Sequence, residues 1–144
     1  MKFYESTVER KIVIVRIDQD EEVIQFLENI AMSLKIESGL FTGIGAIKQA
    51  TISFYDYQSK SYIDKEIDER MEVINLTGNI SYKYAEEKPF IHAHITLSDK
   101  QCNVYGGHLK RAIVGVTLEI FILPINDRIE RIYDQSLGLF IWKP

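Results

Sequence analysis

The residues of this sequence whose types and spacing best fit a chemical site are its three histidines. His92 and His94 stand two positions apart, and His108 is the third. Side chains at i and i+2 of a β-strand point to the same face, so the first two imidazoles can reach one metal ion. Three neutral imidazoles with one free coordination position match a zinc-type site, which nickel, copper or iron could also occupy. The competing interpretation is that His92 and His94 are an unmetallated polar pair on a half-exposed strand.

The chain between the second and third histidines indicates how His108 reaches the other two. Turn-forming residues 99–101 separate the strand-like segment 89–97 from another that opens at residue 103. Pairing across that turn places residues near His108 beside those near His92. Two glycines directly before His108 allow close approach of the backbone and let the ring point inward. The sequence therefore predicts a single site built from all three histidines.

Two glutamates are the candidates for a catalytic role beside such a metal. Glu119 lies inside the apolar segment 113–123, where a lone carboxylate would be costly to bury unpaired, and Glu72 begins another strand-like segment. Either could orient a histidine or act as a general base toward a metal-bound water. The alternatives are an ion pair between Glu119 and an arginine such as Arg128, and an exposed edge charge for Glu72. The residue types alone do not decide between these roles.

One segment has the periodicity of a helix. Within residues 21–38, apolar side chains recur at three- and four-residue steps, which is typical of an amphipathic helix. Asp18 or Asp20 is the predicted N-cap, and Gly39 is predicted to end the helix. We expect residues 42–46, which contain two glycines, to form a tight connection to the next strand; the context does not fit a phosphate-binding loop.

The remaining segments read as strands joined mostly by hairpins. β-branched and aromatic residues with partial alternation predict strands at 10–18, 46–57, 61–67, 71–81, 89–97, 103–105, 113–123 and 138–142. The length of 144 residues fits one domain spanning 1–144. One main helix packed on a mostly antiparallel sheet of about seven strands is an α+β architecture.

Composition narrows the class of protein and its location. The net charge is −4, and basic residues occur in pairs at most, which argues against strong nucleic-acid binding by a monomer. Residues 1–6 carry early charges and do not resemble a secretory signal, and the apolar stretch 113–125 is too short to span a bilayer. A single cysteine excludes an internal disulfide. We therefore expect a cytoplasmic protein without a membrane partner.

Several motifs together resemble one known family, the PPC domain (plants and prokaryotes conserved). The matching segments are EVINLTGNIS at 72–81, PFIHAHITLSD at 89–99, VYGGHL at 104–109, VGVTLE at 114–119 and GIGA at 43–46. The resemblance covers nearly the whole chain and is closest to the free-standing prokaryotic members, which are described as candidate DNA-binding proteins. It implies a homotrimer, with the family's histidines at His92, His94 and His108 and a metal held there in some prokaryotic members.

The resemblance and the histidines lead to two expected functions. The first is a trimeric module that binds a divalent transition metal, zinc above all, and has a DNA-linked or regulatory role with DNA or a protein as partner. Plant members carry an Arg-Gly-Arg-Pro minor-groove motif that this sequence lacks. The alternative is a metal-dependent, hydrolase-like enzyme acting on a small molecule at a subunit interface.

Overall fold

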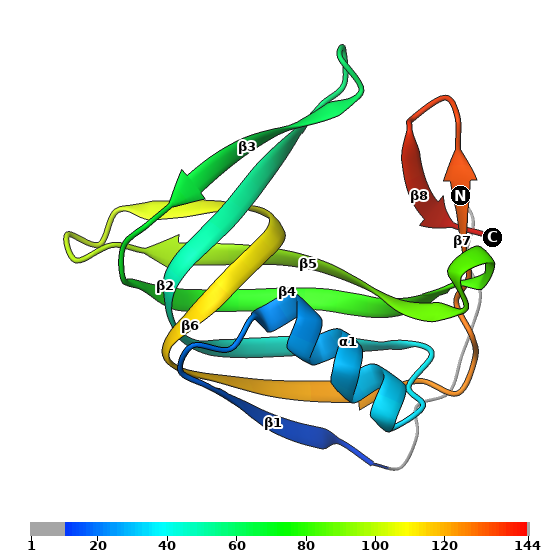
Figure 1. Ribbon diagram of the computed structural model, residues 1–144, viewed down its shortest axis with the longest axis horizontal. Coiled ribbons are helices and arrows are strands. Elements are labelled where there is room, and N and C mark those ends of the chain that lie inside the picture. Colours follow the sequence, from blue (N-terminus) through cyan, green and yellow to red (C-terminus); the bar gives the residue numbers. More distant parts are fainter. Residues whose placement is uncertain (1–10, 144) are drawn as a thin grey trace.

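One helix and eight strands make up residues 11–143, the part of the chain that the computed structural model describes (Figure 1). The expectation that residues 1–6 are not a signal concerns residues outside this range. The elements are β1 (Val13–Asp18), α1 (Val23–Ser33), β2 (Gly39–Asp56), β3 (Ser61–Ile67), β4 (Met71–Lys83), a 3₁₀ turn (Tyr84–Glu86), β5 (Lys88–Ser98), β6 (Val104–Pro124), β7 (Arg131–Asp134) and β8 (Leu139–Trp142).

The six larger strands form one antiparallel sheet in the order β1-β6-β5-β4-β2-β3. Strands β2 and β6 are long, with 18 and 21 residues, and they also pair with each other. The additional pairing closes a ring of β2, β4, β5 and β6, because β6 pairs with β5 near its start and with β2 and β1 further along. The predicted α+β architecture with a mostly antiparallel sheet is confirmed.

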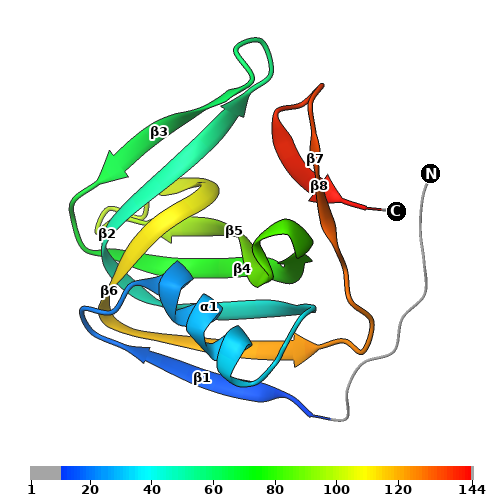
Figure 2. The ribbon, with the colours of Figure 1, turned by 45° about the vertical axis from the view of Figure 1, so that its right-hand side comes forward.

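Two details of the strand prediction were wrong. Segments 103–105 and 113–123 are parts of the single strand β6, since the residues between them continue the pairing with β2. The segment after residue 128 contains a further strand, β7, which pairs with β8 in a separate two-stranded sheet. The β7–β8 hairpin lies at one side of the molecule, apart from the six-stranded sheet (Figures 1 and 2).

The helix is shorter than predicted and is capped differently. Glu22 is the N-cap, and its carboxylate accepts hydrogen bonds from the backbone N–H groups of Ile24 and Gln25. The helix ends at Ser33 with Leu34 as its C-cap, and Lys35 with φ of 56° takes the left-handed position that was expected of a glycine. Gly39 instead begins β2. Figure 2 shows α1 lying across the sheet, and the buried side chains on α1 are Val23, Leu27 and Ala31.

The glycine segment 42–46 is not a connection but an internal part of β2, where the pairing with β4 changes register between Gly43 and Gly45. Small residues are needed here because β2 and β6 approach each other closely. A Cβ atom on Gly45 would lie 2.1 Å from the carbonyl oxygen of Thr117. The tight approach, and not a turn, explains the two glycines.

The sheet has a buried face and an exposed face. The buried face carries the large side chains of the core, among them Phe41, Leu76, Ile80, Ile95, Leu118, Ile120 and Ile122. A row of directly paired residues crosses the opposite face: His108, His94, Thr77, Thr42, Phe121 and Ile14. No helix within residues 11–143 has the length and hydropathy that crossing a membrane requires.

Candidate metal site

The three histidines converge on one face of the sheet, as their spacing predicted. His94 on β5 pairs directly with His108 on β6, and His92 lies two residues before His94 on the same face of β5. The ring centroids are 5.3 Å apart for His92 and His94, 5.2 Å for His92 and His108, and 5.7 Å for His94 and His108. One ring nitrogen from each residue lies within 4.8 Å of the other two. The strand pairing thus holds three donors around a common point.

The protonation state of the half-buried rings suits a metal. Burial lowers the pKa of His92 to about 4, and the positive charge of Arg131 acts in the same direction. Burial also lowers the pKa of His108 to about 4, helped by His94, Lys110 and Arg131. Both imidazoles are therefore neutral at pH 7, and a neutral imidazole is the form whose lone pair binds a metal.

His108 is held in place by an aromatic neighbour and keeps a free nitrogen. The ring of Tyr62 on β3 stacks on it, with centroids 4.8 Å apart and planes inclined by 25°. Its Nδ1 atom is buried and has no hydrogen-bond partner among the described residues. A buried ring nitrogen without a partner is costly to leave unsatisfied, and a bound metal or its ligand is one explanation of such an atom.

A buried arginine lies directly beside His92. Arg131 on β7 is 8% exposed, and its Nη2 atom is 3.4 Å from Nδ1 of His92. Its stronger hydrogen bonds run from Nε to Ser81 Oγ at 2.6 Å, from Nη1 to the Phe140 carbonyl oxygen at 2.7 Å, and from Nη2 to Asn79 Oδ1 at 3.0 Å. Burial lowers the pKa of Arg131 to about 10, so the guanidinium remains charged at pH 7.

The other charges near the cluster neutralise each other. Lys110 forms an ion pair with Asp64 at 2.8 Å, and Asp64 also accepts a hydrogen bond from Ser53. These two hydrogen bonds hold the pKa of Asp64 below its ordinary value. The cluster itself contains no aspartate or glutamate of the described part of the chain. The charge next to the histidines is therefore dominated by Arg131.

The residues present fit a divalent transition metal. Three imidazoles are a donor set that zinc shares with copper, nickel and iron, and they leave a coordination position free. The neutral rings and the unsatisfied Nδ1 of His108 are the observations of this structure that support the fit. A metal bound there would act as a Lewis acid and could activate a bound water.

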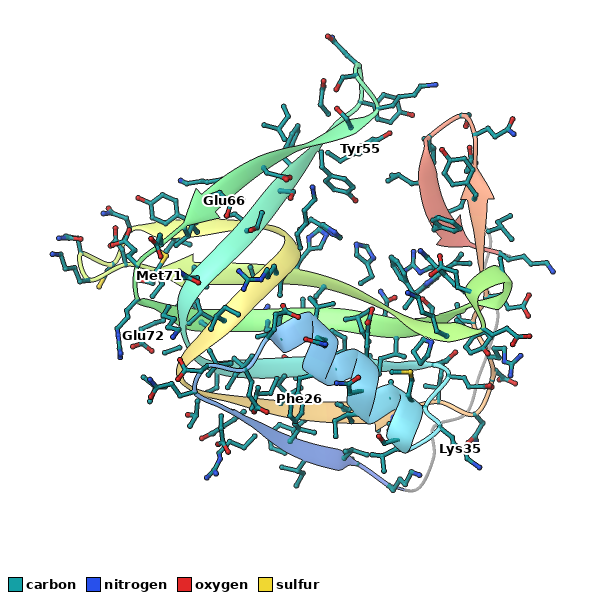
Figure 3. The ribbon with its side chains drawn as sticks, viewed as in Figure 1. Phe26, Lys35, Tyr55, Glu66, Met71 and Glu72 are labelled. Carbon is teal, nitrogen blue, oxygen red and sulfur yellow. The ribbon has the colours of Figure 1, made fainter. Side chains whose placement is uncertain are left out.

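The two candidate glutamates lie together, but away from the histidines of the same chain. Glu72 and Glu119 both line a pocket of about 420 Å³ between β2, β4 and β6. Thr77, the partner of His94, is five residues further along β4 than Glu72, which corresponds to roughly 16 Å in an extended strand. Glu72 lies at the opposite end of β4 from the β7–β8 hairpin (Figure 3). A base role for either glutamate stays a prediction, and within one chain these positions do not support it.

The alternative of an ion pair between Glu119 and Arg128 does not hold. Glu119 is exposed, so the apolar strand that contains it does not bury its charge. Arg128 pairs with Glu37 instead of Glu119. Glu72 is exposed, as the edge-charge interpretation required, but it does not lie at an edge, because β4 pairs with both β2 and β5 at this residue.

Sequence reasoning missed two residues that touch the cluster, Arg131 and Tyr62. Tyr62 comes from a strand that was predicted correctly, but no pattern assigns its ring to His108. Arg131 lies between the predicted strands 113–123 and 138–142, where no element was predicted, and its position depends on the β7–β8 hairpin folding back toward β4. The alternation of apolar and charged residues over 129–132, a short strand-like run that contains Arg131, is the one signal that could have drawn attention to it.

Comparisons with known proteins identify a matching family and several structures of the same fold. A family described as Plants and Prokaryotes Conserved (PCC) domain matches residues 4–126. A metal-containing protein from Archaeoglobus fulgidus is 36% identical, with a TM-score of 0.91 and complete coverage of both chains. A plant- and prokaryote-conserved (PPC) protein from Pyrococcus horikoshii is 30% identical, with a TM-score of 0.91, covering 100% of this chain and 98% of that one. A protein from Bacteroides thetaiotaomicron, provisionally described as DNA-binding, is 34% identical, with a TM-score of 0.88 and 96% coverage of each chain.

The chain also resembles part of a larger protein. Two sequences of the bifunctional protein GlmU, from two Synechococcus strains, are 26% identical to it over 131 and 127 residues. The chain covers 19% of the length of each of them.

Proposed function

We propose that this chain, which belongs to the Plants and Prokaryotes Conserved (PCC) domain family, is a trimeric module that binds a divalent transition metal through His92, His94 and His108. The observation that carries the proposal is the convergence of three ring nitrogens within 4.8 Å from two directly paired strands. Zinc is the preferred ion because it commonly takes three imidazoles with an open position. The similarity to a metal-containing protein of the same fold supports the proposal.

Elemental analysis tests metal binding directly. Protein purified without a histidine tag should hold about one metal ion per chain, since a preformed three-histidine site binds such ions tightly. A content below about 0.2 ions per chain, with no uptake when zinc is added to the metal-free protein, would contradict the proposal.

The trimeric part of the proposal has support from the exposed face of the sheet. By register, Ile14, Leu40, Ile44 and Phe121 share this face, and each is at least half exposed. Exposed apolar side chains that cluster on a strand face mark a protein–protein interface. Further copies of this chain suit the face because it also carries both signs of charge, with Arg16 opposite Glu119.

The oligomeric state tests this assembly. Size-exclusion chromatography with light scattering should give the mass of three chains for the wild type and a smaller mass for Phe121→Asp. Met32→Asp is the matched control, because Met32 is similarly exposed but lies on α1. A wild-type monomer, or a trimer that Phe121→Asp leaves intact, would contradict the proposed assembly through this face.

A DNA-linked regulatory role is supported by the descriptions of two similar structures, from Bacteroides thetaiotaomicron and Ralstonia eutropha. The net charge of −4 opposes direct phosphate contacts, which supply most of the affinity in non-specific DNA binding. Fluorescence anisotropy with duplex DNA at low and moderate salt tests the direct version. If the protein does not bind duplex DNA at low salt, any regulatory role would have to act through a protein partner.

The alternative function is a metal-dependent hydrolase acting on a small molecule. The observation that favours it is the exposure of His94, which would leave a metal held by the three histidines accessible to water and substrate. A carboxylate base would have to come from a neighbouring copy, because the pocket of Glu72 and Glu119 lies apart from the histidines. Replacing both glutamates with glutamine should abolish hydrolysis but not metal binding if this alternative is correct.

A further inference from the structure

Arg131 is a buried cation whose described partners do not compensate its charge. Its hydrogen bonds end on a serine hydroxyl, a backbone carbonyl and an asparagine oxygen, all of which are neutral. Among residues 11–143, no carboxylate forms an ion pair with it. Burying a charge without a partner of opposite sign is unfavourable, so such an arginine favours an anion as a ligand.

The predicted metal ligands bring no negative charge either. All three are imidazoles, whereas many metal sites include a carboxylate that offsets part of the ion's charge. Asp64, the acid whose charge acts on His108, already pairs with Lys110. A divalent ion at this site would therefore stand next to the guanidinium of Arg131, and the free coordination position would strongly favour an anion over a neutral molecule.

The weak contact between Arg131 and His92 could be replaced by a stronger hydrogen bond from Arg131 to a ligand. At 3.4 Å, the distance from Nη2 to Nδ1 is longer than a normal hydrogen bond. A charge-assisted bond from a guanidinium to a carboxylate is shorter and about twice as strong as a neutral one. The side of Arg131 that faces the histidines thus offers a donor for a ligand oxygen.

The surroundings favour an organic anion. The guanidinium of Arg131 lies 4.7 Å from the centroid of the Phe90 ring, and Tyr62 covers one face of His108. Sites that combine aromatic walls with a few polar groups are typical of small organic ligands. An inorganic ion such as phosphate would gain nothing from these rings.

We propose that the free position of the His92, His94 and His108 metal binds the carboxylate of a small organic acid, and that Arg131 provides its counter-charge. This inference rests on the proposed metal binding and names the ligand class for that site. Arg131 acts here as a ligand-binding residue, and no covalent step is involved.

Cobalt(II) provides the probe, because its visible absorption reports changes in coordination. The intact chain is first loaded with cobalt, and the stoichiometry is measured. Acetate should then change the spectrum in a saturable way, whereas acetamide, which has a similar shape but no charge, should not. Inorganic phosphate should act more weakly than acetate. If acetate leaves the spectrum unchanged, or if acetamide or phosphate matches it, the proposed ligand class is wrong.

The role of Arg131 is tested by Arg131→Met, with Arg128→Met as the matched control. Arg128 is exposed, stacks on Tyr82 and pairs with Glu37, so its loss removes one positive charge without touching the histidines. Arg131→Met should weaken acetate binding by about 10- to 100-fold, as expected for a lost hydrogen bond between charged groups, and Arg128→Met should change it less than twofold. Equal acetate affinity in Arg131→Met and the wild type would contradict the assignment.

Two outcomes separate this inference from the metal proposal. Absence of cobalt binding in the wild type would contradict the metal site itself, whereas cobalt binding without an acetate response contradicts only the anion. If Arg131→Met does not fold or does not hold cobalt, Arg131→Gln replaces it, because glutamine keeps a hydrogen-bond donor but removes the positive charge. Arg131→Gln should bind acetate more weakly than the wild type, and unchanged affinity would again exclude Arg131.

Discussion

His94 and His108 occupy directly opposed positions on β5 and β6, and this pairing brings the third imidazole to the first two. The relationship depends on register, because moving one strand by a single residue would send its side chains to the other face. The short turn before residue 104 and the close approach of Gly107 to the backbone of Ser53 help to hold β6 in that register. The site is therefore a property of the sheet pairing and needs no long loop.

Removing one ligand should abolish tight metal binding without unfolding the chain. His94 is the best position because it is the exposed member of the cluster. We expect His94→Ala to weaken zinc affinity by more than about 100-fold, beyond the 10- to 100-fold typical of residues that only support a ligand. Competition with a chromophoric chelator measures the affinity, and circular dichroism checks the fold.

The matched control for this variant is Thr96→Ala, which alters the next residue on the same face of β5. It should leave zinc affinity unchanged. A His94→Ala protein that binds zinc like the wild type would show that His94 is not a ligand.

The candidate site could be predicted from the sequence to the extent that it depends on local pattern. His92 and His94 lie on one strand, and the turn that brings back His108 is short, so periodicity and hairpin pairing suffice. Arg131 and Tyr62 reach the cluster through tertiary packing of separate hairpins. No local pattern encodes those contacts, and the sequence therefore could not reveal them.

Local sequence patterns also predicted only part of the fold. Strand β3 was predicted with its bounds because alternation and turn signals are local. The continuous strand β6 was divided in two, since the polar pair Lys110 and Arg111 looks like a break until its pairing with β2 is known. The helix end was misplaced because Lys35, and not a glycine, adopts the left-handed conformation.

The stability of the metal-free protein should depend on pH through His92 and His108. Their pKa of about 4 in the folded chain lies below the ordinary value of 6.5. Between these values the unfolded chain binds more protons than the folded one, so the free energy of unfolding should fall as the pH drops from about 6.5 to about 4. Above pH 7 these two residues should cause no further change.

Urea denaturation of the metal-free protein at several pH values measures this slope. Carboxylates with lowered pKa, such as Asp56 and Asp64, lose their contribution below about pH 5, so the slope between about pH 6.5 and 5 is the part that reports the histidines. His92→Phe removes one of the two titrating groups and should show a smaller slope. A slope identical to that of the wild type would mean that His92 does not titrate abnormally.

The stacking of Tyr62 on His108 should contribute to metal affinity by fixing the orientation of the ring. We expect Tyr62→Ala to weaken zinc binding by about tenfold, in the range observed when supports of metal ligands are lost. Tyr62→Phe keeps the aromatic ring and loses only the hydroxyl, so it should bind zinc like the wild type. Chelator competition on both variants distinguishes stacking from any role of the hydroxyl, which would weaken both equally.

Gly78 on β4 should be intolerant of any side chain because β4 and β5 are in close contact beside His92. A Cβ atom at this position would lie 2.3 Å from the carbonyl oxygen of His92 and 2.4 Å from the ring of Phe41. Gly78→Ala must therefore push β5 or Phe41 away, and overpacking of this kind typically costs about 1–3 kcal/mol. Because the displaced backbone belongs to His92, zinc affinity should fall together with the free energy of unfolding.

Gly106→Ala is the control for this variant, since it lies near the same histidines on β6 but its added Cβ would come no closer than 3.1 Å to a neighbouring atom. Urea denaturation and chelator competition on both variants give the two free energies. Gly106→Ala should lose less stability than Gly78→Ala and should keep its zinc affinity. If Gly78→Ala is destabilised but binds zinc as tightly as the wild type, the backbone at His92 does not limit the geometry of the site.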